Sequence, residues 1–349
     1  MANKAPYIQI GTRKIGKEFP PFVIPEIGIN HEGSLAKAKR MVKDAYEAGA
    51  ECVKFQCHVI EDEMTPEAKK VIPGNAEESI WDIMERCALS EKEDKVLKDY
   101  VEKLGMLYLS TPFSRAAANR LEKLGVQAYK IGSGECNNYP LLRHIASFGK
   151  PVILSTGMND IASIRKSVSI LRASNIPFAL LHCTSLYPTP YEKVRLDAML
   201  ELSKEFPDAV YGLSDHSLLN YTCYGATALR GSIFEKHFTS DKKWPGPDVP
   251  ISIDPGELQE LIKGTGAIWK ALGGKKTILK EEQPTIDFAY ATVVSIRDIR
   301  EGESFSYDNV WVKRPGTGEI LASEFERVLK CRAKRFIKKD THLKRNHLG

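Results

Sequence analysis

The stretch PVILSTGMNDIASIRKSVSILRASNIPFALLHCTS, residues 151–185, contains the repeating unit that decides the fold. It begins with a short apolar run (151–158) and ends with a second one (178–185), and between them apolar residues recur at three- and four-residue steps. Such runs are typical of strands buried on both faces, and the spacing between them is typical of an amphipathic helix. The segment therefore predicts two parallel strands joined by a helix.

The same unit recurs along most of the chain. Further apolar runs lie at 22–29, 51–58, 106–113, 128–135, 210–217 and 233–239. Further amphipathic segments lie at 35–49, 91–105, 114–125, 194–207 and 257–274. Eight strand–helix units over about 250 residues predict an α/β fold, a (β/α)8 TIM barrel. An open doubly wound sheet is the alternative, but no GxGxxG motif follows the first run, which argues against a dinucleotide-binding fold.

The composition changes towards the end of the chain. We predict a catalytic barrel over 1–274, a charged linker over 275–289, and a small β-rich domain over 290–349, where short strand-like runs alternate with turn signals. Within the barrel, the interval 59–90 is long for a connection between a strand and a helix. Long connections in compact domains are usually lids or binding loops, so we expect such a loop here.

Composition excludes several classes of protein. Of 349 residues, 42% are hydrophobic and 27% are charged, which is ordinary for a globular protein, and the net charge of +5 comes partly from a basic stretch at 330–349. We interpret this stretch as a solvated end rather than a nucleic-acid site. The seven cysteines show no CxxC spacing, and no apolar run resembles a signal peptide or a membrane span. A cytoplasmic protein without membrane or nucleic-acid partners is predicted.

Polar residues stand where each predicted strand ends. Catalytic groups of such barrels lie at the carboxyl ends of the strands. Burying polar groups without partners costs about 1–3 kcal/mol each, so a purely structural barrel would not accumulate them there. The polar residues at these ends include Glu26, Lys54, Gln56, Thr111, Lys130, Ser133, Glu135, Ser155, Ser185, Ser214, Asp215, His216, Glu235, Lys236 and His237.

Two kinds of binding site are indicated at this rim. His216 and His237 follow consecutive runs and could bring two imidazoles onto one divalent cation, although paired histidines are often hydrogen-bonded core residues. Lys54 and Lys130 lie inside apolar runs, and together with serines beside glycines they predict a phosphate site. Snorkelling lysines are the bland alternative, and a lysine that forms a Schiff base is the other functional one.

Several motifs at these strand ends resemble those of the bacterial sialic acid synthases. They include EIGINHEG (26–33), YKIGSGECNNYPLL (129–142), HCTSLYPTPYE (182–192), GLSDHS (212–217) and VKRPGTG (312–318), and the resemblance covers essentially the whole chain. It implies a barrel followed by an antifreeze-like (SAF) domain, in a homodimer that swaps this domain over the partner's active site. It also implies that phosphoenolpyruvate and N-acetylmannosamine condense with water to N-acetylneuraminate and phosphate, assisted by Mn²⁺, with Mg²⁺ or Co²⁺ as alternatives.

The resemblance also implies roles for single residues. His216 and His237 match metal ligands. Glu26 and Glu135 match the acidic catalytic pair, and Arg314 matches an arginine delivered by the partner's small domain. Substrate-binding positions are matched by Lys54, Gln56, Asn75, Thr111, Lys130, Ser133, Ser155, Ser185, Tyr187 and Asp248. Ser185 departs from the pattern, because N-acetylneuraminate synthases carry Asn there, so one phosphate or sugar contact is expected to be shorter or water-mediated.

Other functions remain open at this point. Sister enzymes use a diacetamido-trideoxy sugar and form legionaminic or pseudaminic acid, and animal-type synthases use a phosphorylated sugar. A metal-independent aldolase with a Schiff-base lysine is a more distant alternative. A carbohydrate-binding or ice-binding protein with an antifreeze-like module belongs to another class, but simple binding does not need a rim of acids, lysines and histidines.

Overall fold

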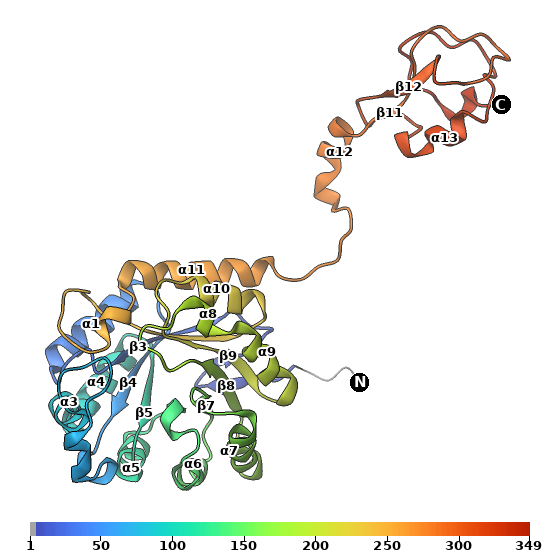
Figure 1. The fold of residues 1–349 in the computed structure, drawn as a ribbon. Helices are drawn as coiled ribbons and strands as arrows, with labels where there is room; N and C mark the ends of the chain where they lie inside the picture. The colour runs from blue at the N-terminus through green and yellow to red at the C-terminus, as the bar shows by residue number, and fades with distance from the viewer. Residues whose placement is uncertain (1–4) are drawn as a thin grey trace. The chain divides into compact units, whose positions relative to one another are not determined.

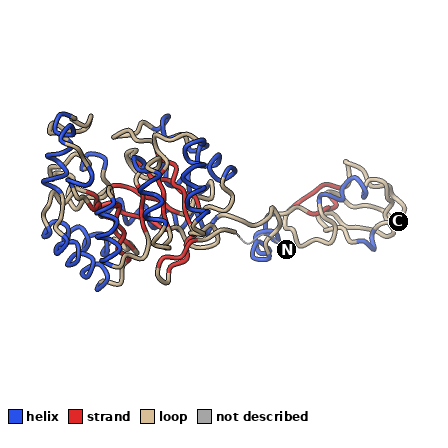
Figure 2. Tube along the Cα trace, turned by 90° about the horizontal axis from the view of Figure 1, so that it is seen from below, coloured by secondary structure: helices blue, strands red, loops and turns tan. Residues whose placement is uncertain are grey.

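The computed structural model of the chain describes residues 5–349 (Figure 1). Contacts divide the chain into two compact units, Met1–Gly273 and Gly274–Gly349. In the first unit the strands lie inside a ring of helices, as Figure 2 shows in red and blue. This unit is the (β/α)8 barrel that the alternation of apolar and amphipathic segments predicts.

Eight parallel strands form the barrel wall, in the order β5-β4-β3-β10-β9-β8-β7-β6. The end strands β5 and β6 pack side by side, so the sheet curls round on itself. Each predicted apolar run forms one of these strands. Their bounds are β3 (Phe22–Gly28), β4 (Cys52–Cys57), β5 (Leu107–Pro112), β6 (Tyr129–Ile131), β7 (Val152–Ser155), β8 (Phe178–Cys183), β9 (Val210–Asp215) and β10 (Ile233–His237).

The six predicted amphipathic segments form helices on the outside of this wall. They are α1 (Leu35–Glu47), α4 (Glu91–Lys103), α5 (Arg115–Leu124), α7 (Ile161–Ala173), α9 (Leu196–Glu205) and α11 (Pro255–Ala271). Two further outer helices, α6 (Tyr139–Ala146) and α10 (Tyr221–Ala228), were not predicted. Both are only about two turns long, and the sequence of α10, YTCYGATA, has no charged face to reveal its period.

Several short elements occupy the connections between strands and helices. The interval 59–90 is not a plain loop, because α2 (Ile60–Glu63), a 3₁₀ turn (Pro66–Lys70) and α3 (Ile80–Cys87) lie in it, and Ser79 caps α3. Another short helix, α8 (Tyr191–Val194), follows β8. Within the described residues, no helix has an apolar stretch long enough to cross a membrane.

A hairpin before the barrel closes its amino-terminal end. Strands β1 (Ile8–Ile10) and β2 (Arg13–Ile15) pair antiparallel. Ile8, Ile10 and Ile15 are at most 1% exposed, and they cluster with inward side chains from the first halves of the barrel strands. Strands of three residues are too short for a periodic pattern, so the sequence did not predict them. The hairpin leaves the carboxyl end of the barrel as the open one.

Truncating a hairpin isoleucine should destabilise the barrel. Ile10→Ala removes a fully buried side chain between the hairpin and the strands, so the free energy of unfolding should fall by about 2–5 kcal/mol. Gln9→Ala, on the exposed face of the same strand, should change it by less than about 0.5 kcal/mol. Urea unfolding followed by circular dichroism measures both. Equal effects of the two substitutions would show that the hairpin does not seal the core.

The second unit is a small domain with its own core. It contains α12 (Gln283–Ala289), the antiparallel strands β11 (Thr292–Ser295) and β12 (Val310–Lys313), and α13 (Phe325–Val328). Isolated bridges such as Ile299 with Ile337 extend the pairing. Helix α12 and a 3₁₀ turn (Lys280–Glu282) occupy much of the segment 275–289, which composition had indicated as a linker. The core residues include Val293, Ile299, Phe305, Val310, Ile320, Phe325, Val328, Ile337 and Leu343.

Candidate active site

The carboxyl ends of the eight barrel strands surround a cavity of about 190 Å³, which we call the lysine pocket. Every strand, or the turn that follows it, contributes at least one polar side chain to its wall. The pocket brings together all the predicted site residues except Asn75, Asp248 and Arg314. Those in its wall are Glu26, Lys54, Gln56, Thr111, Lys130, Ser133, Glu135, Ser155, Ser185, Tyr187, His216 and His237.

Lys54 is buried beside a carboxylate at the base of the pocket. Its Nζ lies 2.7 Å from Glu26 Oε2 and donates to Thr111 Oγ1 at 3.1 Å. Gln56 Nε2 donates to the other oxygen of Glu26 at 3.0 Å, and Gln56 Oε1 lies 3.0 Å from His58 Nε2. Both oxygens of Glu26 are therefore held, which fixes the direction in which this carboxylate faces the pocket.

Lys130 has its own carboxylate partner, Glu235, a rim residue for which the sequence indicated no role. Lys130 Nζ lies 3.3 Å from Glu235 Oε1 and donates to Ser155 Oγ at 2.8 Å. Glu235 also accepts from Ser214 Oγ at 3.0 Å and lies 4.0 Å from Lys54 Nζ. Glu235 and His237 are two residues apart on β10 and line the same pocket, and this alternation in IFEKH was the available signal.

The four charges shift one another's pKa values in different directions. Burial raises the pKa of Glu26 to about 7, and the nearby Glu235 adds to this although Lys54 opposes it. Burial would raise the pKa of Glu235 as well, but Lys130 and Lys54 hold it below its ordinary value. Burial lowers the pKa of Lys130, whereas for Lys54 the effect of Glu235 and Glu26 outweighs burial and raises it. The pocket therefore holds a proton-accepting carboxylate next to two lysines.

Two hydroxyl groups of the pocket wall, those of Ser133 and Ser185, lie next to Gly157. The backbone N–H of Gly157 donates to Ser133 Oγ at 3.0 Å. A Cβ on Gly157 would lie only 2.6 Å from Ser185 Oγ and 2.8 Å from Ser133 Oγ, so this close approach requires glycine. Ser185 Oγ is buried and has no hydrogen-bond partner. A buried hydroxyl without a partner beside a lysine indicates a site for a bound anion.

Glu135 stands in the turn that follows β6. Burial raises its pKa to about 7, and the negative charge of Glu63 contributes. Its Oε2 is buried without a hydrogen-bond partner. Glu135 can therefore hold or release a proton near neutral pH, and it has a free oxygen for a ligand hydroxyl.

The predicted metal ligands meet in the same pocket, with ring centroids 5.4 Å apart. His216 Nδ1 lies 3.0 Å from the Thr184 carbonyl oxygen, which only accepts, so Nδ1 carries a proton. Burial alone would lower the pKa of His216, but Cys183 and this hydrogen bond raise it above its ordinary value. His237 Nδ1 is buried without a hydrogen-bond partner. Burial and His216 hold the pKa of His237 well below its ordinary value, so it is neutral. Metal binding needs the neutral form of each imidazole, which His237 already has and which His216 reaches by losing one proton. Two such imidazoles suit a divalent cation.

The rest of a coordination sphere would have to come from other groups. Among residues 5–349, no three His, Cys, Asp or Glu side chains are placed to hold a metal ion together. The chain therefore fits a cation with two protein ligands, whose remaining positions would be taken by water or substrate oxygens. This open coordination is typical of catalytic rather than structural metal sites.

Two further predicted residues lie beside the pocket rather than in its wall. Asp248 Oδ2 is 3.6 Å from His237 Nδ1, and burial raises the pKa of Asp248 to about 6. Asn75 Nδ2 donates to Asp248 Oδ1 at 3.4 Å and to the Pro247 carbonyl at 3.3 Å. Tyr187, in the wall itself, stacks on His216 with ring centroids 4.2 Å apart. Asn75 and Asp248 are thus connected to the pocket through His237.

Arg314 belongs to the second unit. It is exposed, and its guanidinium carbon lies 5.5 Å from the ring centroid of Phe288 in the same unit. Its predicted role in a partner's active site stays a prediction.

The model of the NeuB family matches residues 41–277. This chain belongs to the NeuB family. An uncharacterized protein of Methanocaldococcus jannaschii, MJ1065, is 40% identical to it over 89% of this chain and 90% of the relative. An N,N'-diacetyllegionaminic acid synthase of Campylobacter jejuni is 38% identical over 88% of this chain and 94% of the relative.

A solved structure supports the same family. It is an N-acetylneuraminic acid synthetase of Leptospira borgpetersenii, crystallised with citrate, and it is 34% identical to this chain with a TM-score of 0.74. The match covers 82% of this chain and 97% of that protein. NeuB-family proteins thus share this fold while their names refer to different sugar acids.

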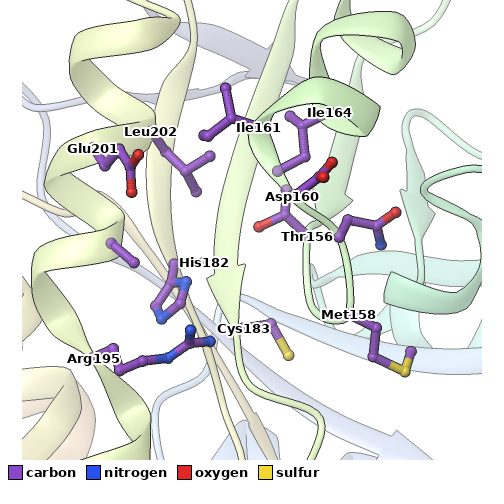
Figure 3. A pocket seen from close by; sticks show the side chains of 12 residues that line it. Thr156, Met158, Asp160, Ile161, Ile164, His182, Cys183, Arg195, Glu201 and Leu202 are labelled. Atoms are coloured by element: carbon purple, nitrogen blue, oxygen red, sulfur yellow. The ribbon is translucent and has the colours of Figure 1, made fainter.

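A larger cavity of this NeuB-family barrel, about 480 Å³, lies against α7 and α9 (Figure 3). It shares only Met158 and Cys183 with the lysine pocket. Its wall combines Ile161, Ile164 and Leu202 with a few polar groups, and it lacks buried lysines and paired carboxylates. The chemistry that can bind an anion beside a proton acceptor is therefore in the smaller lysine pocket.

The raised pKa of Glu135 has a consequence for stability. Because folding raises this pKa from 4.5 to about 7, the contribution of Glu135 to stability is complete below pH 4.5 and is lost as the pH rises through 7. Glu135→Gln is always neutral and avoids this loss. The difference in melting temperature, variant minus parent, should therefore be about 2–4 °C higher at pH 8 than at pH 5.

Differential scanning calorimetry at the two pH values measures this effect. Glu67→Gln, which changes an exposed glutamate, is the control and should show the same difference from the parent at both pH values. A pH-independent difference for Glu135→Gln would contradict the buried, protonated state of Glu135.

Proposed function

We propose that this NeuB-family chain condenses phosphoenolpyruvate with the open-chain form of an N-acetylated amino sugar, giving a nonulosonic acid and phosphate. The observation that supports it best is the lysine pocket itself, where Lys54 and Lys130 share one cavity with the unpartnered hydroxyl of Ser185 and with two imidazoles. An anion, a proton acceptor and a cation site in one cavity of this size suit a reaction between an enol phosphate and an aldehyde.

Two acceptor sugars have support. The sequence motifs favour N-acetylmannosamine, which would give N-acetylneuraminate. The 38% identity to an N,N'-diacetyllegionaminic acid synthase favours a diacetamido-trideoxy sugar instead. Ser185 stands where N-acetylneuraminate synthases carry Asn, so the sugar or phosphate contact at this point differs from that pattern. We keep N-acetylmannosamine as the primary proposal and the diacetamido sugar as the alternative.

In this proposal, different side chains of the pocket bind the two substrates. Lys130, Ser133, Ser155 and Ser185 offer an ammonium and three hydroxyls for the phosphate of phosphoenolpyruvate. Lys54 offers a second ammonium for its carboxylate, because its strong pairing keeps it charged. The sugar would enter beside Tyr187, Asn75 and Asp248.

A divalent cation at His216 and His237, manganese by the family pattern, would supply Lewis-acid polarisation of the aldehyde oxygen. The side chains of the pocket carry out the other steps. They orient the two substrates, neutralise the phosphate and carboxylate charges, and move protons within the pocket.

The proposed reaction forms one carbon–carbon bond and releases phosphate. The methylene carbon of phosphoenolpyruvate bonds to the aldehyde carbon, and the aldehyde oxygen takes up a proton. Water then bonds to the carbon that carries the phosphate and gives up one proton. The bond from this carbon to the phosphate oxygen breaks, the remaining hydroxyl proton leaves with the phosphate, and a carbonyl group is left on the carbon. Glu26, whose pKa is about 7, accepts the proton of that water. Glu135 holds sugar hydroxyls with its free oxygen and supplies a proton.

Apolar side chains exposed at the rim support the proposed swapped homodimer. Loops that follow β7, β8 and β9 expose Met158 (72%), Leu186 (46%), Leu218 (48%) and Leu219 (46%), and the first residue of α10 exposes Tyr221 (66%). A rim of this kind is a typical interface surface. In the proposal, the second unit of the partner covers it and brings Arg314 to the mouth of the pocket. A cytoplasmic location is the one expected for an enzyme of this kind.

Phosphate release tests the reaction directly. Release from phosphoenolpyruvate should require both an acceptor sugar and Mn²⁺, and the sugar with the higher kcat/KM, N-acetylmannosamine or the diacetamido-trideoxy sugar, is the acceptor. Lys130→Ala should lower kcat/KM by about 10²–10³-fold, because a buried charge is lost from the phosphate site. Lys204→Ala, on the outer surface of α9, is the matched control and should change nothing.

Two results would replace the proposed function. Full activity after exhaustive chelation would refute the role of the cation. A covalent adduct trapped with pyruvate and borohydride would indicate a Schiff-base aldolase, whereas sugar binding without any phosphate release would indicate a binding protein.

Complementation between variants tests whether Arg314 acts on a partner's pocket. Arg314→Ala should leave the melting temperature unchanged, because this side chain is exposed, and should lower kcat at least about tenfold. When Arg314→Ala and Lys130→Ala chains are co-expressed, half of the dimers should contain one intact composite site, and activity should recover to about a quarter of the parental value. Recovery no greater than the sum of the two variants would place Arg314 outside the partner's site.

A further inference from the structure

A further buried ion pair lies on the outer side of β9 and β10, the strands that end at the two histidines. Lys236 Nζ is 2.7 Å from Asp215 Oδ2, and the two side chains are 0% and 1% exposed. In the pairing of β9 with β10, these two residues are direct neighbours. Neither lines the lysine pocket. Each is the chain neighbour of one histidine, Asp215 of His216 and Lys236 of His237.

The alternation of side chains along a strand explains this arrangement. Successive side chains of a strand point to opposite faces, so Glu235 and His237 face the pocket while Lys236 faces outwards. On the outer side α10 packs against β9, and its Thr222 Oγ1 donates to Asp215 Oδ2 at 2.6 Å. The pair therefore sits between the barrel wall and α10.

Further hydrogen bonds tie the pair to the backbone on both sides of His216. Ser217 donates its backbone N–H to Asp215 Oδ1 at 2.9 Å and its hydroxyl to Asp215 Oδ2 at 3.0 Å. Lys236 Nζ also donates to the carbonyl oxygen of Ser217. The turn Asp215–Ser217 is thus closed around His216 and fastened to β10 one residue before His237.

Stability alone does not account for such a pair. Taking two charges out of water costs roughly as much as their attraction returns, and buried ion pairs can often be replaced by apolar residues without loss. The pair fixes the distance between the ends of β9 and β10, next to the two histidines. A fixed ligand geometry is what residues behind a metal site usually provide.

We propose that Asp215 and Lys236 are positioning residues that hold His216 and His237 at the separation needed to bind one divalent cation. This inference rests on the proposed metal-assisted function and adds to it a pair of residues outside the pocket. They touch neither substrate nor cation, and they act through the backbone of the two histidines.

The test measures Mn²⁺ binding to the metal-free protein by isothermal titration calorimetry, together with melting temperature. Lys236→Met alone leaves a buried aspartate without its partner and is expected to lose stability as well as metal affinity. The informative variant is the double substitution Asp215→Leu with Lys236→Met, which removes both charges. It should melt near the parental temperature, yet its Kd for Mn²⁺ should rise at least about tenfold.

Two further variants keep the test decisive. Thr222→Val removes one hydrogen bond to Asp215 with almost no change in volume, so it preserves folding and should weaken Mn²⁺ binding about threefold. Arg120→Met breaks the buried pair with Asp94, far from the histidines along the chain, and should lower the melting temperature without changing the Kd. This control separates loss of stability from loss of position.

The outcomes distinguish this inference from the proposed function. If the parent binds Mn²⁺ and the double variant and Thr222→Val bind it equally well, the pair is only structural and the inference is wrong, while the proposed function stands. If the parent itself binds no divalent cation, the metal step of the proposed function fails and the inference fails with it. Steady-state kinetics of Thr222→Val give a further check. A lowered kcat with an unchanged KM for phosphoenolpyruvate supports the inference.

Discussion

The site depends on the burial of two lysines and two glutamates inside the mouth of the barrel. Lys54 with Glu26 and Lys130 with Glu235 form pairs at 2.7 Å and 3.3 Å, in a place that apolar side chains could fill. The attraction within each pair offsets the loss of hydration without a clear gain in stability. The arrangement makes sense as preparation for a ligand, because an anion can take over an ammonium partner while the released carboxylate accepts a proton.

The barrel serves this chemistry by having two different ends. At the amino end, the isoleucines of the β1–β2 hairpin form an apolar seal with the first residues of the strands. At the carboxyl end, each strand turns from apolar to polar within one or two residues. The continuous hydrogen-bonded wall between the ends keeps these polar side chains in register, so that groups from eight separate segments converge on about 190 Å³.

A single strand can carry more than one task because its side chains alternate. On β10, Glu235 and His237 face the lysine pocket, while Lys236 reaches Asp215 on the outer side. Neighbouring residues of one strand thus serve the pocket on one face and an ion pair on the other. Relatives in the NeuB family share this fold, but their names refer to different sugar acids.

The sequence by itself determined the eight strands, the six longer helices and the polar rim, because apolar runs and helical periods are local properties of the chain. The rule that strand ends meet at one face was enough to place Lys54, Lys130, His216 and His237 together. Only the tertiary structure showed the hairpin seal, the uncharged helix α10, and the pairing of Glu235 with Lys130. These depend on which strands become neighbours and in what register when the barrel closes, and no local pattern in the sequence records that geometry.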